Sequence, residues 1–115
     1  DKLDMGAKMA ILCSPHNPGG RVWKAEELER FGKLCKSKDA VIVSDEIHSD
    51  IVYNGNKHIP IASISSELSE RTITCIAPSK TFNIAGLSAS AVIIPDETLR
   101  RRFADTFKKT WGGMA

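Results

Sequence analysis

The chain has 115 residues, of which 42% are hydrophobic and 26% charged, and its net charge is +2 at pH 7. This length suits one domain, and this composition argues against an intrinsically disordered chain. The nearly balanced charge gives no reason to expect nucleic acid or an acidic membrane surface as a partner, and no apolar stretch is long enough to span a bilayer.

The first predicted elements are a buried strand and an amphipathic helix. Residues 9–13 (MAILC) form a short apolar run before a Ser-Pro pair, a pattern typical of a strand buried on both faces of a parallel sheet. Residues 24–36 predict a helix without Ser, Thr, Asp or Asn at its N-cap, which forgoes about 1 kcal/mol of capping. Its apolar face consists of Leu28, Phe31, Leu34 and Cys35.

The rest of the chain continues this alternation. We expect strands at residues 40–43, 72–76 and 89–94, because each is a short run rich in apolar or β-branched side chains. Residues 61–70 predict a short helix, and a last helix is expected after Asp96, which can cap it. The apolar stripe of this last helix consists of Leu99, Phe103, Phe107 and Trp111. Strands alternating with helices predict an α/β layer architecture.

Lys80 is the most informative single residue. It follows the predicted strand at residues 72–76, between a Pro-Ser turn and a segment of small residues, where it can be held in a pocket. Partial desolvation of an ammonium favours the neutral amine, which can form a Schiff base with a carbonyl group. A single lysine at a strand end proves little, so the residues that accompany it decide its interpretation.

Three strings carry a family resemblance: residues 15–23 (PHNPGGRVW), 45–50 (DEIHSD) and 79–83 (SKTFN), with Lys80 placed 35 residues after Asp45. In this order and spacing they resemble the large domain of the pyridoxal-phosphate-dependent aminotransferase class I/II family. The match is closest to its C–S lyase branch, the cystathionine β-lyase-like proteins. The resemblance covers essentially the whole chain, and three spaced motifs together are a much stronger signal than any one alone.

The resemblance implies a three-layer α/β/α fold with a mainly parallel sheet. It also implies that residues 1–115 are part of the large, cofactor-binding domain of a longer enzyme. The main phosphate loop would then precede this segment, and the small domain with the substrate-carboxylate arginine would follow it. Enzymes of this family are typically homodimers that act on amino acids. We therefore expect the isolated segment to bind cofactor poorly and to catalyse no reaction.

The resemblance assigns a role to each candidate site residue. Lys80 is the Schiff-base lysine that also moves the substrate Cα proton, and Asp45 is the carboxylate at the pyridinium nitrogen. Asn17 hydrogen-bonds the 3′-oxygen of the cofactor, and Ser79 donates to its phosphate. His48 stands where many aminotransferases have a tyrosine at the cofactor; it lies near the ring or is a structural surface residue.

Simpler interpretations exist for each motif. A strand-end aspartate often caps a helix, and an Asn-Pro-Gly run is often only a turn, in which His16 needs no catalytic duty. Two positions also depart from the family pattern. Related enzymes often have Ser or Thr three residues before the lysine and Arg eight residues after it, both on the phosphate, whereas this chain has Ala77 and Ser88.

These residues favour a carbon–sulfur β-lyase that eliminates a thiol from cystathionine or cysteine and yields pyruvate and ammonia. An aminotransferase on the same scaffold is the close alternative. A metal site built from Asp45, His48 and His16 lacks further ligands, and a non-catalytic regulator is also open. The basic residues of the last helix, Arg100–Arg102 with Lys108 and Lys109, are interpreted as its solvated face rather than as a nucleic-acid site.

The cysteines bear on the compartment. Cys13, Cys35 and Cys75 are odd in number and have no CxxC spacing. This favours reduced, mostly buried thiols over a disulfide framework, and hence a cytoplasmic protein.

Overall fold

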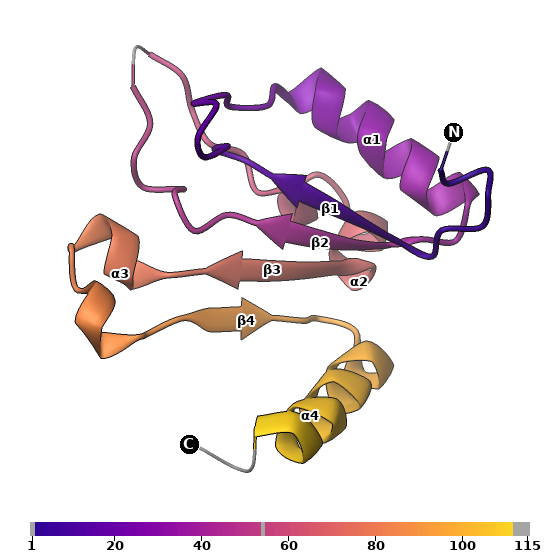
Figure 1. Cartoon of the computed structure of the whole chain (residues 1–115). Helices are drawn as coiled ribbons and strands as arrows, with labels where there is room; N and C mark the ends of the chain where they lie inside the picture. The colour runs from indigo at the N-terminus through magenta and orange to yellow at the C-terminus, as the bar shows by residue number, and fades with distance from the viewer. Residues whose placement is uncertain (1, 54, 112–115) are drawn as a thin grey trace.

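A four-stranded sheet organises the chain in the computed structural model, which describes residues 2–53 and 55–111. Strands β1 (Met9–Cys13), β2 (Val41–Asp45) and β3 (Thr72–Ile76) are parallel, and β4 (Ala91–Ile93) is antiparallel to β3. The strand order is β1-β2-β3-β4 (Figure 1). The expected α/β fold with a mainly parallel sheet flanked by helices is confirmed.

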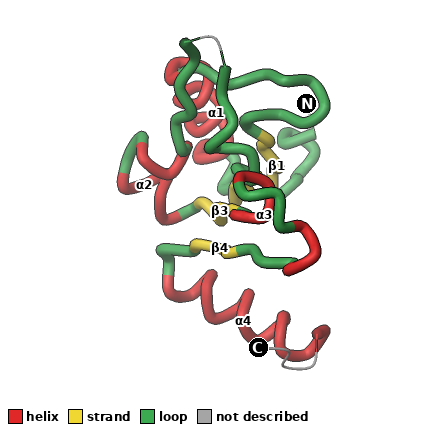
Figure 2. The backbone as a smooth tube through the Cα atoms, turned by 90° about the vertical axis from the view of Figure 1, so that its left-hand side faces the viewer, coloured by secondary structure: helices red, strands yellow, loops and turns green. Residues whose placement is uncertain are grey.

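The helices fall between the strands, as the alternating pattern predicts. Figure 2 shows α1 and α2 on the same side of the sheet, and α4 beyond the edge formed by β4. Among the described residues, no helix is both long and apolar enough to cross a membrane. The α-helices are α1 (Ala25–Ser37), α2 (Ser66–Glu70), α3 (Pro78–Thr81) and α4 (Glu97–Trp111), and the 3-10 helices are η1 (Ile61–Ser63) and η2 (Ala85–Leu87).

The core lies between one face of β1–β3 and the helices α1, η1 and α2. The buried apolar side chains there are Leu12, Leu28, Cys35, Ala40, Ile42, Ile61 and Leu68. The Thr72 hydroxyl is also buried, and it donates to the Leu68 carbonyl at 2.6 Å. A buried polar group that is hydrogen-bonded in this way avoids the desolvation cost of an unpaired one.

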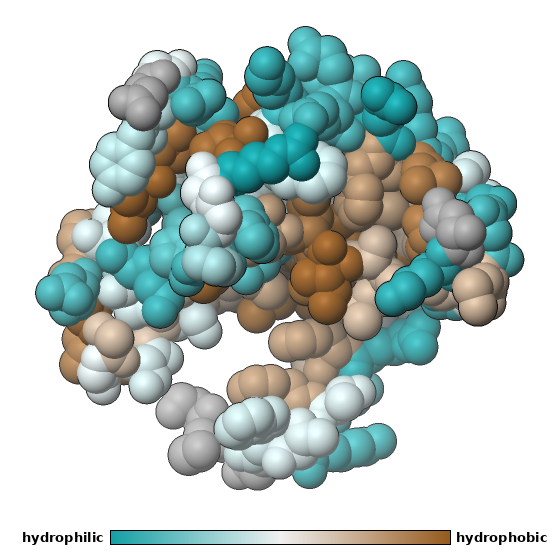
Figure 3. Space-filling view, turned by 45° about the horizontal axis from the view of Figure 1, so that its top comes forward, coloured by the Kyte–Doolittle hydropathy of each residue, from teal (hydrophilic) through white to brown (hydrophobic). Residues whose placement is uncertain are grey.

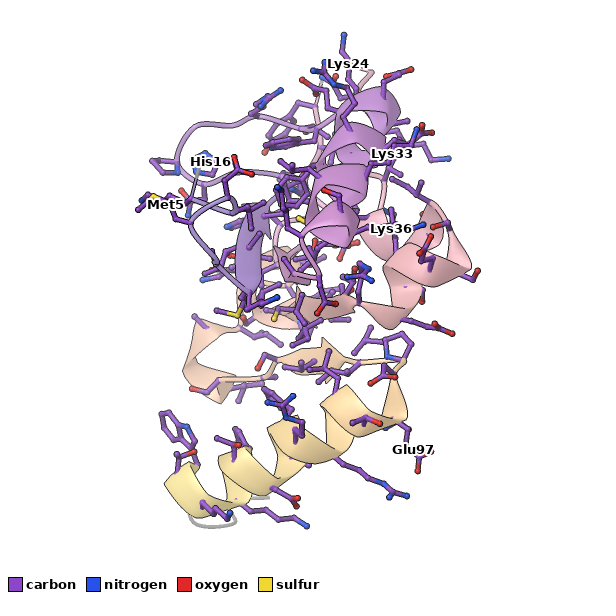
Figure 4. All side chains as sticks on the ribbon, turned by 90° about the vertical axis from the view of Figure 1, so that its right-hand side faces the viewer. Met5, His16, Lys24, Lys33, Lys36 and Glu97 are labelled. Carbon is purple, nitrogen blue, oxygen red and sulfur yellow. The ribbon has the colours of Figure 1, made fainter. Side chains whose placement is uncertain are left out.

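Helix α1 is capped by a glutamate, since its N-cap residue Lys24 offers no capping side chain. The Lys24 backbone N–H donates to the Glu27 carboxylate at 3.0 Å, which is the reciprocal half of a capping box. Glu27 also pairs with Arg21. Farther along, Lys36 extends from the side of α1 that faces α2 (Figure 4) and pairs with Glu67 at 2.8 Å.

Two predicted elements differ in detail from the structure. The helix expected at residues 61–70 is split into η1 and α2, because the Ser65 hydroxyl accepts the Leu68 N–H at 3.2 Å and starts a new helix. The strand expected at residues 89–94 is limited to β4. Its residues are exposed, since it lies at the edge of the sheet and the described helices cover little of it.

Helix α4 has the predicted cap and an uncovered apolar stripe. Asp96 accepts the Leu99 N–H at 2.7 Å, as expected for an N-cap. The rings of Phe103 and Phe107 stack at a centroid distance of 6.0 Å, and those of Phe107 and Trp111 at 6.4 Å. All three rings are nevertheless exposed. The space-filling view likewise shows hydrophobic side chains at the surface between polar ones (Figure 3).

Candidate functional site

The candidate residues gather where the three parallel strands end. Cys13, Asp45 and Cys75 are neighbours across β1, β2 and β3, and all three arrows in Figure 1 point to this edge. The turn that contains Asn17 leaves this edge after β1, and α3, which contains Lys80, follows β3. In open α/β sheets, ligands bind outside the carboxyl ends of the strands.

Asp45 is the last residue of β2 and is half-buried. Its Oδ1 accepts the Ile47 N–H at 3.3 Å, and its Oδ2 accepts the Cys13 thiol at 3.7 Å. Burial, together with the charges of Asp45 and Glu46, raises the pKa of the neighbouring Cys75 thiol, which stays protonated. A carboxylate has about four acceptor positions, so Asp45 can accept a further N–H group.

Asn17 and His48 line one pocket of about 400 Å³. The rest of its wall consists of Pro15, His16, Pro18, Gly20, Val22, Ile51, Val52, Tyr53 and Asn56. The Nε2 atom of His48 is buried and has no hydrogen-bond partner among the described residues. The His16 Nδ1 accepts the Gly19 N–H at 3.2 Å, which supports a turn-forming role for His16.

Ser79 and Lys80 lie on the one-turn helix α3 and do not line this pocket. The next residue, Thr81, donates its hydroxyl to Asp50 at 2.6 Å. This bond joins α3 to the turn that follows Asp45. Lys80 is exposed, which differs from the partial burial expected from the sequence, because the described residues leave its side chain uncovered.

Sequence reasoning missed a buried polar network directly beside Asp45. The Glu46 carboxylate accepts the Ser44 hydroxyl at 2.8 Å through Oε1, and its Oε2 lies 2.8 Å from His58 Nε2. Glu46 is only 3% exposed. No short sequence motif predicts the contact between Glu46 and His58, because a loop brings these two residues together. The one available signal is a charged residue placed directly after a buried strand.

Two further observations concern the possible metal ligands and the basic residues of α4. The described residues contain no group of three or more His, Cys, Asp and Glu side chains that could hold a metal ion. In α4, the Arg100 guanidinium donates to the Ile94 and Pro95 carbonyls at 2.7 and 2.8 Å, and Arg101 pairs with Glu97. These two arginines therefore bond to α4 and to the segment directly before it.

Comparison with known proteins places the chain in a family context. The family model for aminotransferase class I and II matches residues 1–111. Cystathionine beta-lyase PatB of Bacillus subtilis (strain 168) is 50% identical over 112 residues, which are 96% of this chain and 29% of PatB. Human kynurenine–oxoglutarate transaminase 3 is 38% identical over 99 residues, which are 86% of this chain and 22% of the transaminase.

A solved structure of a related protein has the same fold. Cystalysin from Treponema denticola, whose crystal structure contains a pyridoxal 5′-phosphate cofactor, superposes with a TM-score of 0.89 at 42% identity. The superposition covers 95% of this chain and 29% of cystalysin. The chain therefore spans less than a third of the length of the relatives that it matches.

Proposed function

The chain belongs to the aminotransferase class I and II family, and from this premise we propose that it is part of a pyridoxal-phosphate-dependent carbon–sulfur β-lyase. The whole enzyme would break the Cβ–S bond of a sulfur-containing amino acid such as cystathionine or cysteine and release the sulfur as a thiol or as hydrogen sulfide. Hydrolysis of the remaining enamine by water would give pyruvate and ammonia. The proposal includes a homodimer in the cytoplasm, which suits the free thiols of Cys13, Cys35 and Cys75. Residues 1–115 would form part of its large domain.

The convergence at the strand ends carries the proposal. Asp45 ends β2 at the edge where the Asn17 turn and α3 also start, and Thr81 joins α3 to the turn after Asp45. The chain thus brings a carboxylate, an amide and a lysine to one edge of the sheet. Pyridoxal phosphate needs an amine that bonds it and an anion at its ring nitrogen, together with hydrogen-bond donors for its oxygens, and these three groups can supply them.

The side chains at this edge fit that cofactor by their unused bonding capacity. Asp45 retains acceptor positions, and within residues 2–53 and 55–111 no protein partner engages the Ser79 hydroxyl or the Lys80 amine. When bound, pyridoxal phosphate withdraws electrons from the substrate Cα. Asp45 would hold a proton on the ring nitrogen, Asn17 and His48 would contact the ring substituents, and Ser79 would donate to the phosphate. Lys80 would bond the cofactor and move the Cα proton.

Covalent trapping tests the cofactor site. The full-length protein is loaded with pyridoxal phosphate, reduced with borohydride, digested and mapped by mass spectrometry. We expect one pyridoxyl-modified peptide, which contains Lys80, and no such peptide in Lys80→Ala. Lys33→Ala, which removes a lysine from the exposed face of α1 (Figure 4), is the control and should keep the adduct. An adduct-free Lys80 in the folded wild-type protein would refute the proposed function.

The lyase is preferred to the transaminase on two grounds. Identity is 50% to cystathionine beta-lyase PatB and 38% to the human transaminase, and His48 replaces the tyrosine that many aminotransferases have. A paired assay discriminates the reactions. The full-length protein is given cystathionine without a keto acid, and pyruvate and free thiol are measured. Release of both supports the lyase. Product formation only when a keto acid is supplied would assign the transaminase instead.

A further inference from the structure

His58 and Glu46 close the loop that forms one wall of the pocket. The His58 Nε2 lies 2.8 Å from Glu46 Oε2; the Glu46 side chain is buried, at 3% exposed, and the His58 side chain is mostly buried, at 10% exposed. Opposite an ionised carboxylate, which has only acceptor positions, the His58 Nε2 is the donor of this bond. We call this contact the Glu46–His58 clasp. The residues between its two ends include His48, Ile51, Val52, Tyr53 and Asn56, and all five line the pocket that contains Asn17.

The clasp also fixes the end of β2. Successive side chains point to opposite faces of the sheet at the end of β2. The buried side chains of Ser44 and Glu46 therefore lie on one face, and the half-buried side chain of Asp45 lies on the other. Glu46 is held by Ser44 at 2.8 Å and by His58, and its backbone N–H donates to the Cys75 carbonyl at 2.9 Å. These bonds restrict the rotation of the chain directly after Asp45.

We propose that His58 is a positioning residue of the cofactor site: its bond to Glu46 holds the loop and the β2 end so that His48, Asn17 and Asp45 keep their relative places. The proposal rests on the proposed function only for the identity of the ligand. A buried carboxylate that loses one of its two side-chain partners carries a desolvation cost that the fold relieves by opening the loop to water. The pocket wall would then move, although no residue that would contact the cofactor has been substituted.

A matched pair of substitutions in the full-length protein tests the clasp. In His58→Gln, the amide nitrogen reaches the place of the imidazole Nε2 and can still donate to Glu46. In His58→Asn, the shorter amide stops near the place of Nδ1 and cannot. Both substitutes are neutral, polar and smaller than histidine, so a general effect of removing the ring would appear in both variants.

The first readout is tryptic cleavage after Lys57 in cofactor-free protein, which reports loop opening and needs no activity. We expect severalfold faster cleavage in His58→Asn than in wild type, with His58→Gln close to wild type. The second readout is the Kd for pyridoxal phosphate, followed by the absorption band of the bound cofactor. His58→Asn should raise this Kd by about tenfold, by analogy with the loss seen when an outer-shell partner of a metal ligand is removed. The Kd of His58→Gln should stay close to that of wild type.

Equal cleavage and equal Kd in wild type and His58→Asn would overturn the proposal, and so would equal losses in the Asn and Gln variants. If His58→Asn does not fold, Glu46→Met takes its place, because it keeps the length of the side chain and removes both of the oxygens that accept from Ser44 and His58. It should likewise speed cleavage and weaken cofactor binding. A missing Lys80 adduct in wild type would refute the proposed function but leave the cleavage comparison valid, so the two failures are distinguishable.

Discussion

Asp45 lies between two cysteines of the neighbouring strands. The Cys13 thiol donates to its Oδ2 at 3.7 Å, and Cys75 is its partner on β3. A thiol is a weak donor, so it orients the carboxylate while neutralising little of its charge. The charge of Asp45 is therefore available to a cationic ligand group at the strand ends.

We predict that Asp45→Asn in the full-length protein lowers kcat by about 100-fold or more, because a neutral amide cannot hold a proton on the ring nitrogen through an opposite charge. The borohydride-stable adduct at Lys80 should be retained, since Asp45 does not form it. Asp39→Asn is the matched control. Asp39 is 89% exposed and has a φ of 50°, a left-handed conformation that asparagine also tolerates. Equal activity of Asp45→Asn and wild type would contradict the proposed role.

Cys35 predicts a dependence of stability on alkaline pH. Its side chain is fully buried, and burial raises the pKa of the thiol above its usual 9.0, although Arg71 lowers it in part. The folded state therefore keeps a proton that the unfolded state loses. The Cys35 thiol does not lower the free energy of unfolding below pH 9.0. That free energy then decreases as the pH rises towards the folded-state pKa of the thiol. Urea unfolding at increasing pH should show this decrease, and Cys35→Ala should flatten it; an unchanged slope would count against this assignment.

At the scale of elements, helix α1 packs against the core with one face only. Leu28 is 1% exposed and belongs to the core, whereas Leu34 on the same helix is 38% exposed. The same substitution at these two positions separates core packing from helix propensity, because leucine and alanine differ little as helix formers.

We predict that Leu28→Ala lowers the free energy of unfolding of the full-length protein by about 2–5 kcal/mol, the range for a buried leucine. Leu34→Ala should cost less than half as much, since water already contacts its side chain. Chemical denaturation monitored by circular dichroism measures both values. Similar costs at the two positions would show that α1 is covered on both sides in the whole protein.

The elements differ in how far local sequence predicts them. The strands at residues 9–13 and 72–76 were predicted with the observed bounds, because a continuous apolar or β-branched run between breakers is a local signal. The antiparallel direction of β4 depends on its pairing with β3, which no local pattern encodes. The break at Ser65 could have been predicted, since a serine before Glu67 and Leu68 is a helix-start signal.

The candidate site also has features that the sequence predicts and features that it does not. The meeting of Asn17, Asp45 and Lys80 at one edge follows from their positions after parallel strands, so the motif order predicts it. The Glu46–His58 clasp could not be predicted, because its partners are 12 residues apart along a loop whose path the sequence does not specify. The exposure of Lys80 was also not predicted, since burial of a side chain depends on what packs over it.

At the scale of the whole molecule, the described structure leaves much apolar surface uncovered. Ile11 on β1 is 70% exposed, Val92 on β4 is 42% exposed and Phe107 on α4 is 44% exposed. β1 and β4 are the outer strands of the sheet. Outer strands with exposed apolar side chains can pair with other chains.

We therefore predict that the 115-residue chain by itself self-associates through these edges. Ile11→Lys should reduce the association, because a lysine on an outer strand opposes pairing with a second chain. Leu34→Lys adds the same charge on α1, away from the strand edges, and should reduce it less. Sedimentation velocity over a concentration series measures the average mass of each variant. A chain that stays monomeric over the whole series would contradict the prediction, and equal effects of both lysines would assign the association to net charge rather than to β1.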